Sequence, residues 1–284
     1  MAGSTTTTLN DLLPSIVAEA MFVAGERSIM RGLVKNYSLG AGQGKTVTVP
    51  RYPLQSAATV TEGDEVSNTA VSTDGATLTI TTAALRTLVT DLAVQSSASN
   101  VIADLGRLFG EAIARKVDAD LMALFSGFSA GVGDAATALS AATIAKAVAT
   151  LRANAVPADA LACVVNPYVA YDLKANLTNT FANPNAGIIQ NAAMSEGYVG
   201  MLFGVPVFES SLIANNGTAG DYVGAVFHRD ALGLAMIGDI NIETQRRASY
   251  LGTDVVASMH YGVGEIYDGY GVKVTADSSL VDPA

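Results

Sequence analysis

The amino-acid sequence predicts an α+β fold that combines one long helix with several antiparallel strand pairs. Apolar residues recur at helical spacing from about residue 101 to residue 125. Thr alternates with Val from Thr46 to Val49, and with Leu and Ile from Thr77 to Thr81, as in strands that are buried on one face. Strand-like segments return from about residue 199 onwards. This combination of elements along one chain is typical of α+β proteins.

The composition is that of a globular protein that associates with other subunits. Of the 284 residues, 50% are hydrophobic and only 15% are charged. The hydrophobic residues never form the roughly 18 consecutive apolar positions that a membrane helix requires. Because no linker rich in Pro, Ser, Gly or charge divides the chain, we expect one interlocked unit. A chain with so few charges is expected to bury part of its surface against other subunits, so we expect an oligomer.

Charge and cysteine content exclude several classes of protein. The formal net charge is −10, from 26 acidic and 16 basic residues, which is the wrong sign for a protein that holds phosphate backbones. Cys163 is the only cysteine, so an intrachain disulfide and a four-cysteine zinc site are excluded. Met1–Thr8 has no basic segment followed by an apolar core, so we expect no secretory signal and synthesis in a cytoplasm.

Residues 1–44 are expected to form an arm with helical pieces. Apolar residues recur at helical spacing between Leu9 and Val34. Five of the 16 basic residues lie in and just after this arm: Arg27, Arg31, Lys35, Lys45 and Arg51. Two interpretations remain open for them, a solvated basic face or contact with an acidic patch on a neighbouring subunit.

Residues 45–84 are expected to form a long β-hairpin. The strands at 46–50 and 77–81 can pair, and the segment between them is rich in Ser, Thr, Ala and acidic residues. An isolated hairpin with so little large apolar surface is marginal in water, so this one must lie on the rest of the chain or on a neighbour. The candidate inter-subunit residues are therefore basic residues near the arm and acidic residues near the hairpin tip: Arg27, Arg31, Lys35, Arg51, Glu62, Asp64 and Glu65.

Residues 85–135 are expected to contain the longest helix of the protein. Ser99 or Asn100 can cap its start, and Gly127 stops it. At about 1.5 Å per residue, the helix spans about 40 Å, enough to cross the whole subunit. Its apolar stripe is expected to be buried and includes Val101, Leu105, Leu108, Phe109, Ala112, Ile113, Val117, Leu121, Leu124 and Phe125.

Residues 136–235 are expected to form a mixed α/β domain, and residues 236–284 to return as strands to the domain of the long helix. A helix from about Ser140 to Asn154 precedes a buried strand at Leu161–Val165. Asn166 can cap the next helix, with Pro167 at its first position. Later strands are expected at Val205–Phe208, Tyr222–Phe227, Ile240–Thr244, Asp254–Tyr261 and Gly271–Thr275.

Two motifs resemble those of nucleotide-binding proteins and hydrolases but stand in the wrong structural context. Residues 40–46 resemble a phosphate-binding loop, yet Leu39 stands where the first glycine is needed, and a strand follows instead of a helix. Residues 127–131 satisfy G-x-S-x-G around Ser129, with His228 and His260 downstream. A nucleophile elbow needs a strand before the serine and a helix after it, whereas here a long helix precedes it. A loop that ends the helix is the favoured interpretation.

The remaining candidates for chemistry are weak. His228-Arg229-Asp230 copies a kinase catalytic loop, but the metal-binding Asn expected five residues after the aspartate is Ala235. His260, Glu265 and Asp268 could be imagined as metal ligands, although a solvated role is favoured. We therefore expect no catalytic, cofactor-binding or metal-binding residues, no cofactor and no enzymatic activity.

The order of the parts resembles the major capsid proteins of tailed bacteriophages, which have the Hong Kong 97-type fold. In that family the parts are the N-arm (here 1–44), the E-loop hairpin (45–84), the peripheral domain with its spine helix (85–135), the axial domain (136–235) and the returning strands (236–284). Three local patterns are similar to the family's: Val164-Val165-Asn166-Pro167 followed by Tyr171-Asp172-Leu173, the segment Gly200–Ser210, and Gly220-Asp221-Tyr222 leading to Arg229-Asp230-Ala231.

The resemblance implies a shell subunit that self-assembles as pentamers and hexamers into an icosahedral or prolate head around double-stranded DNA. It also implies a virion location, assembly in the host cytoplasm, and a portal and possibly a decoration protein as partners. The family's cross-linking lysine has no counterpart near the hairpin tip, and the short arm leaves scaffolding to a separate protein. An encapsulin-like nanocompartment shell is one alternative, and a serine hydrolase that uses Ser129 is another.

Overall fold

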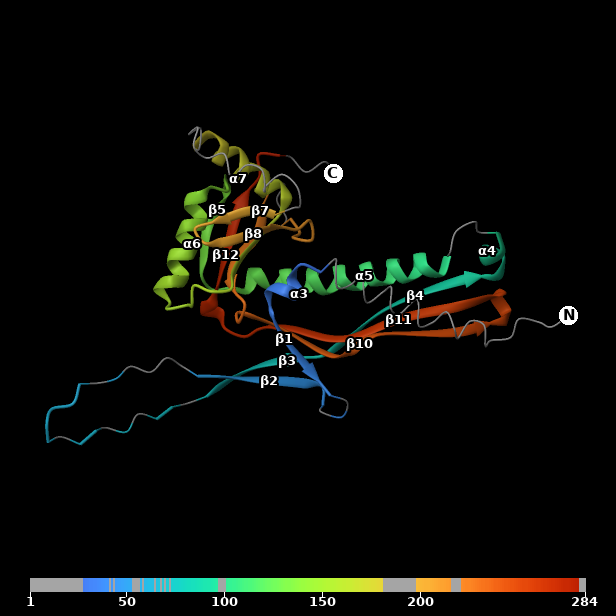
Figure 1. Cartoon of the computed structure of the whole chain (residues 1–284), viewed down its shortest axis with the longest axis horizontal. Coiled ribbons are helices and arrows are strands. Elements are labelled where there is room, and N and C mark those ends of the chain that lie inside the picture. Colours follow the sequence, from blue (N-terminus) through green and yellow to red (C-terminus); the bar gives the residue numbers. More distant parts are fainter. Residues whose placement is uncertain are drawn as a thin grey trace.

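The chain forms two bodies joined end to end, with a hairpin that extends away from both (Figure 1). The computed structural model describes residues 28–280 except 41, 43, 53–56, 58, 64, 67, 69, 72, 97–100, 181–197 and 216–220. The side chains of 94–96, 101–103, 176–180 and 198–199 are not described either. Most of the expected arm, with Arg27, lies outside the described residues, as do the candidate caps Ser99 and Asn100. Within the described part, no helix is long and apolar enough to cross a membrane.

The first body is a four-stranded sheet with a long helix along one face. The strand order is β1-β10-β11-β4, with β1 parallel to β10 and the other neighbours antiparallel. Ile242, Val255 and Ala257 share a buried core with the helix α5, which runs along the sheet (Figure 1). The bounds are α3 Met30–Leu33, β1 Lys35–Leu39, β4 Thr81–Thr90, α4 Asp91–Ser96, α5 Val101–Ala123, β10 Leu232–Arg247, η2 Ala248–Tyr250 and β11 Gly252–Glu265.

The long helix lies where the sequence predicts it, but its buried face is narrower than expected. α5 passes into a 3-10 turn, η1, at Leu124–Gly127, so the predicted stop at Gly127 is confirmed. Phe109 and Leu121 are fully buried. Leu108 is 55% exposed, so the expectation that it is buried is wrong. Successive residues are about 100° apart around a helix, so Leu108 and Phe109 point in different directions. The sheet covers the side of α5 that carries Phe109 and leaves Leu108 exposed.

The second body is a six-stranded sheet packed with two helices. The strand order is β5-β12-β9-β6-β8-β7. Every residue of β6 is buried. Strands pair with both of its edges, and its side chains belong to the main hydrophobic core. The bounds are β5 Gly131–Ala138, α6 Ala141–Ala153, β6 Leu161–Val165, α7 Pro167–Thr180, β7 Tyr198–Leu202, β8 Val205–Glu209, β9 Tyr222–His228 and β12 Gly271–Asp277.

Side-chain caps fix the starts of both helices in this body. The Ser140 hydroxyl accepts a hydrogen bond from the Thr143 N–H at 3.3 Å at the start of α6. Oδ1 of Asn166 accepts one from the Tyr168 N–H at 2.9 Å at the start of α7. Pro167 occupies the first position of α7, where a missing N–H costs nothing. The predicted helices and the caps at Ser140 and Asn166 are confirmed.

The hairpin consists of β2 (Thr46–Arg51) and β3 (Asp74–Thr79), paired antiparallel. Thr46 faces Thr79 and Thr48 faces Thr77, so the predicted pairing is confirmed. After Ile80 the chain runs directly into β4, which ties the hairpin to the four-stranded sheet.

The chain crosses between the two bodies three times, after η1, after β9 and after β11. A backbone hydrogen bond from the Ile266 N–H to the Ala231 carbonyl, at 2.8 Å, joins the crossing after β11 to the crossing after β9. A second one, from the Arg229 N–H to the Ala160 carbonyl at 3.1 Å, joins the crossing after β9 to the six-stranded body. The expectation that all of residues 236–284 return to the body of the long helix is wrong for β12. The 3-10 turn η3 (Asp268–Tyr270) redirects the chain, and β12 then pairs with β9 and β5.

Three expected domain boundaries also fall inside strands. The boundary at 84/85 lies within β4, which pairs with β11 of the four-stranded sheet along its whole length. The boundary at 135/136 lies within β5, which belongs entirely to the six-stranded sheet. The boundary at 235/236 lies within β10, which begins at Leu232 in the four-stranded sheet. β10 pairs with β11 without a break across 235/236. β5 pairs with β12 up to Asp134 and again at Ala138, so β12 is its neighbour on both sides of 135/136. None of these positions can therefore separate one body from the other.

Candidate assembly surfaces

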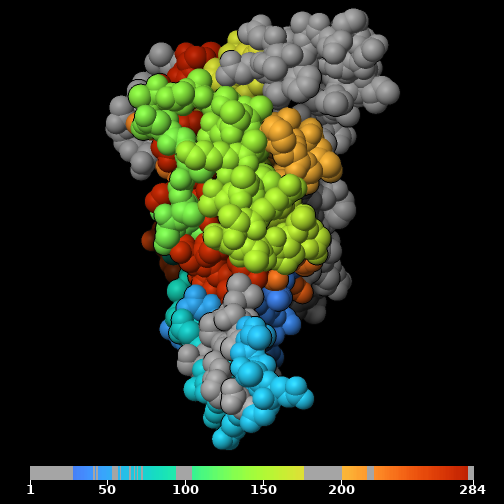
Figure 2. All heavy atoms as spheres, turned by 90° about the vertical axis from the view of Figure 1, so that its left-hand side faces the viewer, coloured from blue at the N-terminus to red at the C-terminus, as the bar shows by residue number. Residues whose placement is uncertain are grey.

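The outer part of the hairpin is exposed throughout the residues that the structure describes. Every described residue from 57 to 73 is exposed. Val66 is 72% exposed and Val71 54%, although valine is usually buried. Glu62 and Glu65 are exposed near the tip, while Asp64 lies outside the described residues. The hairpin projects beyond the body (Figures 1 and 2), so its apolar and acidic side chains are available to another molecule.

The base of the hairpin is held by its own chain. Leu78 and Ile80 are buried with Ala235 in a small core that is separate from the main one. Arg51 forms an ion pair with Asp74 across the hairpin and donates from Nη1 to the Ile266 carbonyl at 2.9 Å. The hairpin therefore has an anchored base and a free outer part.

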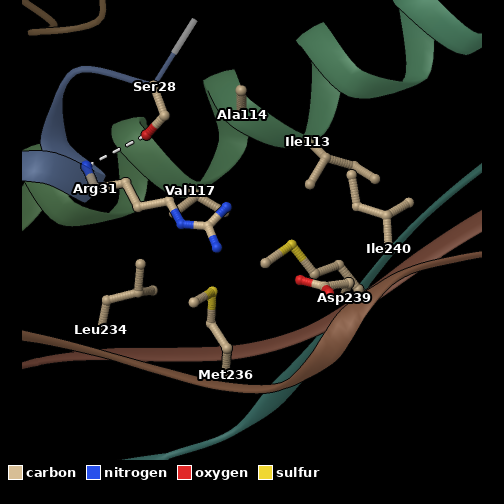
Figure 3. A pocket seen from close by; sticks show the side chains of 10 residues that line it. Ser28, Arg31, Ile113, Ala114, Val117, Leu234, Met236, Asp239 and Ile240 are labelled. Atoms are coloured by element: carbon tan, nitrogen blue, oxygen red, sulfur yellow. Dashed lines mark hydrogen bonds between the residues drawn. The ribbon is translucent and has the colours of Figure 1, made fainter. Parts of the chain in front are cut away.

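The predicted basic candidates have different positions in the structure. Lys35 forms an ion pair with Asp230 at 3.0 Å, and the carboxylate raises the pKa of its ammonium group. Arg51 is engaged at the hairpin base, as described above. Arg31 is half-buried and points into a hollow between α5 and the four-stranded sheet (Figure 3). Of the candidates that are described, Glu62 and Glu65 are therefore the ones at the projecting end of the subunit.

The hollow beside Arg31 is mainly apolar. It encloses about 220 Å³ between α5 and β10 and is lined by Ile113, Val117, Leu234, Met236 and Met259, among others. The carboxylate of Asp239 also lines it (Figure 3). Among the described residues, Arg31 and Asp239 are the only charged ones that line this hollow. The described lining therefore lacks the group of converging acidic and basic side chains that catalysis requires.

A buried carboxylate fixes the point where the N-terminal segment reaches the body. Asp118, on α5, is 2% exposed. It accepts hydrogen bonds from the Ser28 hydroxyl at 2.6 Å and the Ile29 N–H at 2.9 Å, just before α3 begins. Burial raises the pKa of the Asp118 carboxyl, although these hydrogen bonds oppose the rise. The acidic residue within the apolar stripe of α5 is the signal in the sequence that could have identified this contact.

Apolar side chains are also exposed at the end of the four-stranded sheet where α4 and η2 lie. Leu92 is 74% exposed, Tyr250 59% and Leu251 70%. Arg246 and Asp91 form two hydrogen bonds that join the strand end of β10 to the start of α4, and this pairing lowers the pKa of the Asp91 carboxyl. The residues of this end were not singled out from the sequence, because isolated apolar residues in turns give no periodic signal.

A buried acid stabilises the same end of the sheet. The Asp254 side chain is 3% exposed and lies 2.9 Å from Nη2 of Arg86 and 2.6 Å from Nε of Arg247. One carboxylate thus joins neighbouring strands β4, β10 and β11 through two guanidinium groups. Such an arrangement holds a sheet in register and leaves no lone buried charge.

The surroundings of Ser129 differ from those of a hydrolase nucleophile. Ser129 follows the turn η1 and precedes the strand β5, and its N–H donates to Oδ1 of Asp268 at 2.8 Å. Nδ1 of His228 accepts a hydrogen bond from the Asp230 N–H at 3.2 Å, and Nδ1 of His260 lies 2.8 Å from the Thr82 hydroxyl. Each imidazole is thus engaged with a group other than Ser129, in a different turn or strand.

The residues that resemble a phosphate-binding loop and the candidate metal ligands also lack the surroundings that their chemistry requires. The glycine-rich residues 40–46 lead into β2, a strand and not a helix. No group of three or more His, Cys, Asp or Glu side chains that could hold a metal ion occurs among the described residues. Glu265 lies beside Asp268, and burial together with that neighbouring acid raises the pKa of its carboxyl.

The subunit combines an exposed hairpin, a four-stranded sheet covered by a long helix, and a separate six-stranded sheet. A family model described as phage capsid protein matches residues 56–274. The chain belongs to the phage capsid protein family. It is a capsid shell protein. The comparison with curated proteins finds no match.

Solved capsid structures share the fold of this phage capsid protein over nearly its whole length. The capsid of cyanophage P-SCSP1u has a TM-score of 0.67 and 19% identity, with 89% of each chain covered. A structure from Mycobacterium phage Che8 has a TM-score of 0.68 and 20% identity, with 87% of this chain and 90% of that chain covered. The capsid of a native GTA particle has a TM-score of 0.65 and 13% identity, with 92% and 91% covered. The predicted Hong Kong 97-type fold is confirmed.

Proposed function

We propose that this capsid protein assembles with itself into pentamers and hexamers, and that these close into an icosahedral or prolate head around double-stranded DNA. The observation that carries the proposal is the hairpin, whose described outer residues are all exposed while its base is anchored. A hairpin with apolar residues in water is stabilised by a covering surface. A neighbouring copy supplies that surface wherever subunits overlap in a shell.

Charged residues then guide the overlap between neighbours. Glu62, Asp64 and Glu65 give the hairpin tip an acidic character, and Arg27 and Arg31 are the basic candidates near the arm. Lys35 and Arg51 belong to the same proposed set but already pair with Asp230 and Asp74 within the chain. We assign them a weaker part, because a second acid would have to compete with an existing ion pair.

Other components complete the proposed head. A separate scaffolding protein, a portal and possibly a decoration protein join the shell, and assembly takes place in the host cytoplasm. The shell holds DNA without sequence-specific contacts, in line with the net charge of −10. Each contact between subunits can be weak, because every subunit makes several contacts and closure adds them together.

Shortening the hairpin tests the proposal. Replacing residues 55–73 with a tight turn keeps β3 and the ion pair between Arg51 and Asp74 at the hairpin base. It should leave a folded subunit with unchanged far-UV circular dichroism, because the described residues of this segment contribute nothing to either buried core. Electron microscopy should then show loss of closed shells or fragile ones. Normal shells after the deletion would contradict the proposal.

The contents of purified wild-type particles provide a second test. Nuclease-protected double-stranded DNA inside the shells is the expected result. Shells that contain protein cargo instead of DNA would identify a nanocompartment of the encapsulin type. Wild-type protein that stays monomeric at high concentration, in the presence of its phage's other head proteins, would contradict the proposal that this protein forms a shell.

A further inference from the structure

The turn between β7 and β8 holds an aromatic residue in a conformation that does not suit it. Phe203 and Gly204 connect the paired residues Leu202 and Val205, and both have a positive φ, 54° and 83°. A two-residue hairpin turn of this kind strongly favours Asn-Gly, because a side chain such as Phe is strained at positive φ. Phe203 is nevertheless 52% exposed and Met201 on β7 is 62% exposed. Folding of the subunit alone gives no reason for this choice.

The opposite edge of the same sheet has a groove. β5 and β7 are the two edge strands of the six-stranded sheet. Beside β5, a groove of about 340 Å³ lies between this strand and the first turns of α6. Ala138, Leu139 and Ala142 give it small or apolar walls, and Asp134 and Lys146 add one charge of each sign. Figure 2 shows the two regions on opposite flanks of one face, β5 in green and β7–β8 in orange, with α6 between them.

We propose that Met201 and Phe203 of one subunit insert into the groove beside β5 of the next subunit in the same ring. The inference rests on the proposed function, because it takes the rings of five and six as given. The two patches differ and lie on opposite edges of one sheet, so contact between copies is head-to-tail. A repeated head-to-tail contact closes into a ring when its rotation allows.

The size of the contact favours a ring of copies over a pair of proteins. An aromatic side chain buries about 150–250 Å². Even with Met201, the patch falls well short of the roughly 1,200–2,000 Å² that a stable pair buries. In a ring, each subunit uses both patches at once, and the hairpin overlap adds to them. The segment 198–208 carries no charged residue, so it can approach Asp134 and Lys146 without like-charge repulsion.

The substitution Phe203→Asn separates folding from assembly. Asn suits the positive φ of this turn, so the isolated subunit should unfold at the same temperature as wild type or a higher one. Loss of the aromatic side chain should raise the protein concentration needed for rings and shells roughly tenfold or more. Tyr171→Asn is the matched control, because Tyr171 on α7 is also 52% exposed, and it should assemble as wild type does. Assembly of Phe203→Asn at the wild-type concentration would overturn the inference.

A disulfide tests which surface receives the aromatic residue. The native Cys163 is buried, and burial raises the pKa of its thiol to about 12, so it does not compete in the reaction. The double variant Phe203→Cys, Ala142→Cys also lacks the aromatic side chain, so its shells are assembled at a protein concentration raised by about tenfold or more. After mild oxidation these shells should give covalent ladders of up to five or six subunits on a denaturing gel. Each single variant, and the pair Leu251→Cys with Ala142→Cys, should give none.

The two experiments distinguish this inference from the proposed function. Wild-type protein that forms no rings or shells contradicts the proposed function. Shells that form normally from Phe203→Asn overturn the inference and leave the proposed function intact. If Phe203→Asn assembles poorly but the double-cysteine shells do not link, Phe203 contacts a surface other than the groove, and the assignment of the groove is wrong.

Discussion

The carboxylate of Asp118, in the C-terminal half of α5, accepts a hydrogen bond from the Ser28 hydroxyl at 2.6 Å, ninety positions away in the sequence. It also accepts from the Ile29 N–H at 2.9 Å. Replacing Asp118 with Ala removes the acceptor and leaves these donors unpaired in a partly buried site. We expect a loss of about 1.5–3 kcal/mol in the free energy of unfolding, measured by urea denaturation. Asp118→Asn, which keeps one acceptor oxygen, should lose less, and equal losses for both variants would contradict this role.

The same carboxyl gives a prediction for pH. Burial raises the pKa of Asp118 above its value in the unfolded chain, so the folded protein binds this proton more readily than the unfolded one. The stability that this proton contributes is fully present below the unfolded pKa and is lost as pH rises through the folded pKa. The stability of wild type relative to Asp118→Asn should therefore increase as pH falls from 7 to about 4. Parallel denaturation series would show this, and a gap that changes in the opposite direction would contradict it.

The buried face of α5 predicts unequal effects along one helix. Leu121 is fully buried, and its replacement by Ala should cost roughly 2–5 kcal/mol. Leu108 is 55% exposed, and the same replacement should cost less than about 1 kcal/mol. Chemical denaturation of the two variants under identical conditions measures the difference. Similar losses at both positions would show that the sheet covers a wider face of the helix.

Local signals made much of the fold predictable. The strand β6, the capped helices α6 and α7 and the pairing of β2 with β3 all follow from periodicity, caps or alternation within a few residues. The order of these parts was enough to indicate the capsid family. In each case the residues that decide the structure are close together in the sequence.

The parts that sequence reasoning missed depend on partners far away in the chain. β5 is rich in Gly and Ala and has no alternation, and its strand form depends on parallel pairing with β12, about 140 residues later. β1 similarly depends on β10. Leu108 belongs to the helical stripe by spacing, but the width of the buried face depends on the sheet that covers it.

The candidate surfaces were predictable in part. The lack of large apolar residues in the outer hairpin predicted, from composition alone, that this part stays outside the subunit's own core, and its described residues do lie outside both cores. The pairing of Lys35 with Asp230 and of Arg51 with Asp74 was not foreseeable, because clusters of basic residues in sequence do not reveal where acids lie in space. The strained Phe203 likewise became visible only through its backbone φ.

The two-arginine clamp around Asp254 should stabilise the far end of the sheet. The Asp254 side chain is 3% exposed and contacts Arg86 and Arg247. Asp254→Ala leaves both guanidinium groups without this acceptor, and we expect a loss of about 1.5–3 kcal/mol in thermal or chemical denaturation. Lys116→Ala, which breaks the surface ion pair with Asp120, is the control and should cost less than about 0.5 kcal/mol. If Lys116→Ala lowers the free energy of unfolding as much as Asp254→Ala does, the proposed stabilising role of Asp254 is wrong.

The hairpin predicts opposite effects at its base and at its outer part. Leu78 is fully buried and packs against Gly233 and Gly264, whose missing side chains leave room for it. Leu78→Ala should therefore cost the isolated subunit roughly 2–5 kcal/mol. Val66 is 72% exposed, so Val66→Asp should leave the unfolding of the isolated subunit unchanged.

Assembly should reverse this order. In closed shells, Val66→Asp places a charge in the proposed overlap with a neighbour, where burying an unpaired charge is costly. We expect such shells to dissociate at a lower temperature or denaturant concentration than wild type, as followed by light scattering. Leu78→Ala subunits that still fold should form shells whose hairpin contacts are intact, because the outer residues are unchanged. If Val66→Asp destabilises the isolated subunit as much as its shells, the outer hairpin serves the subunit's own fold and not the contact between neighbours.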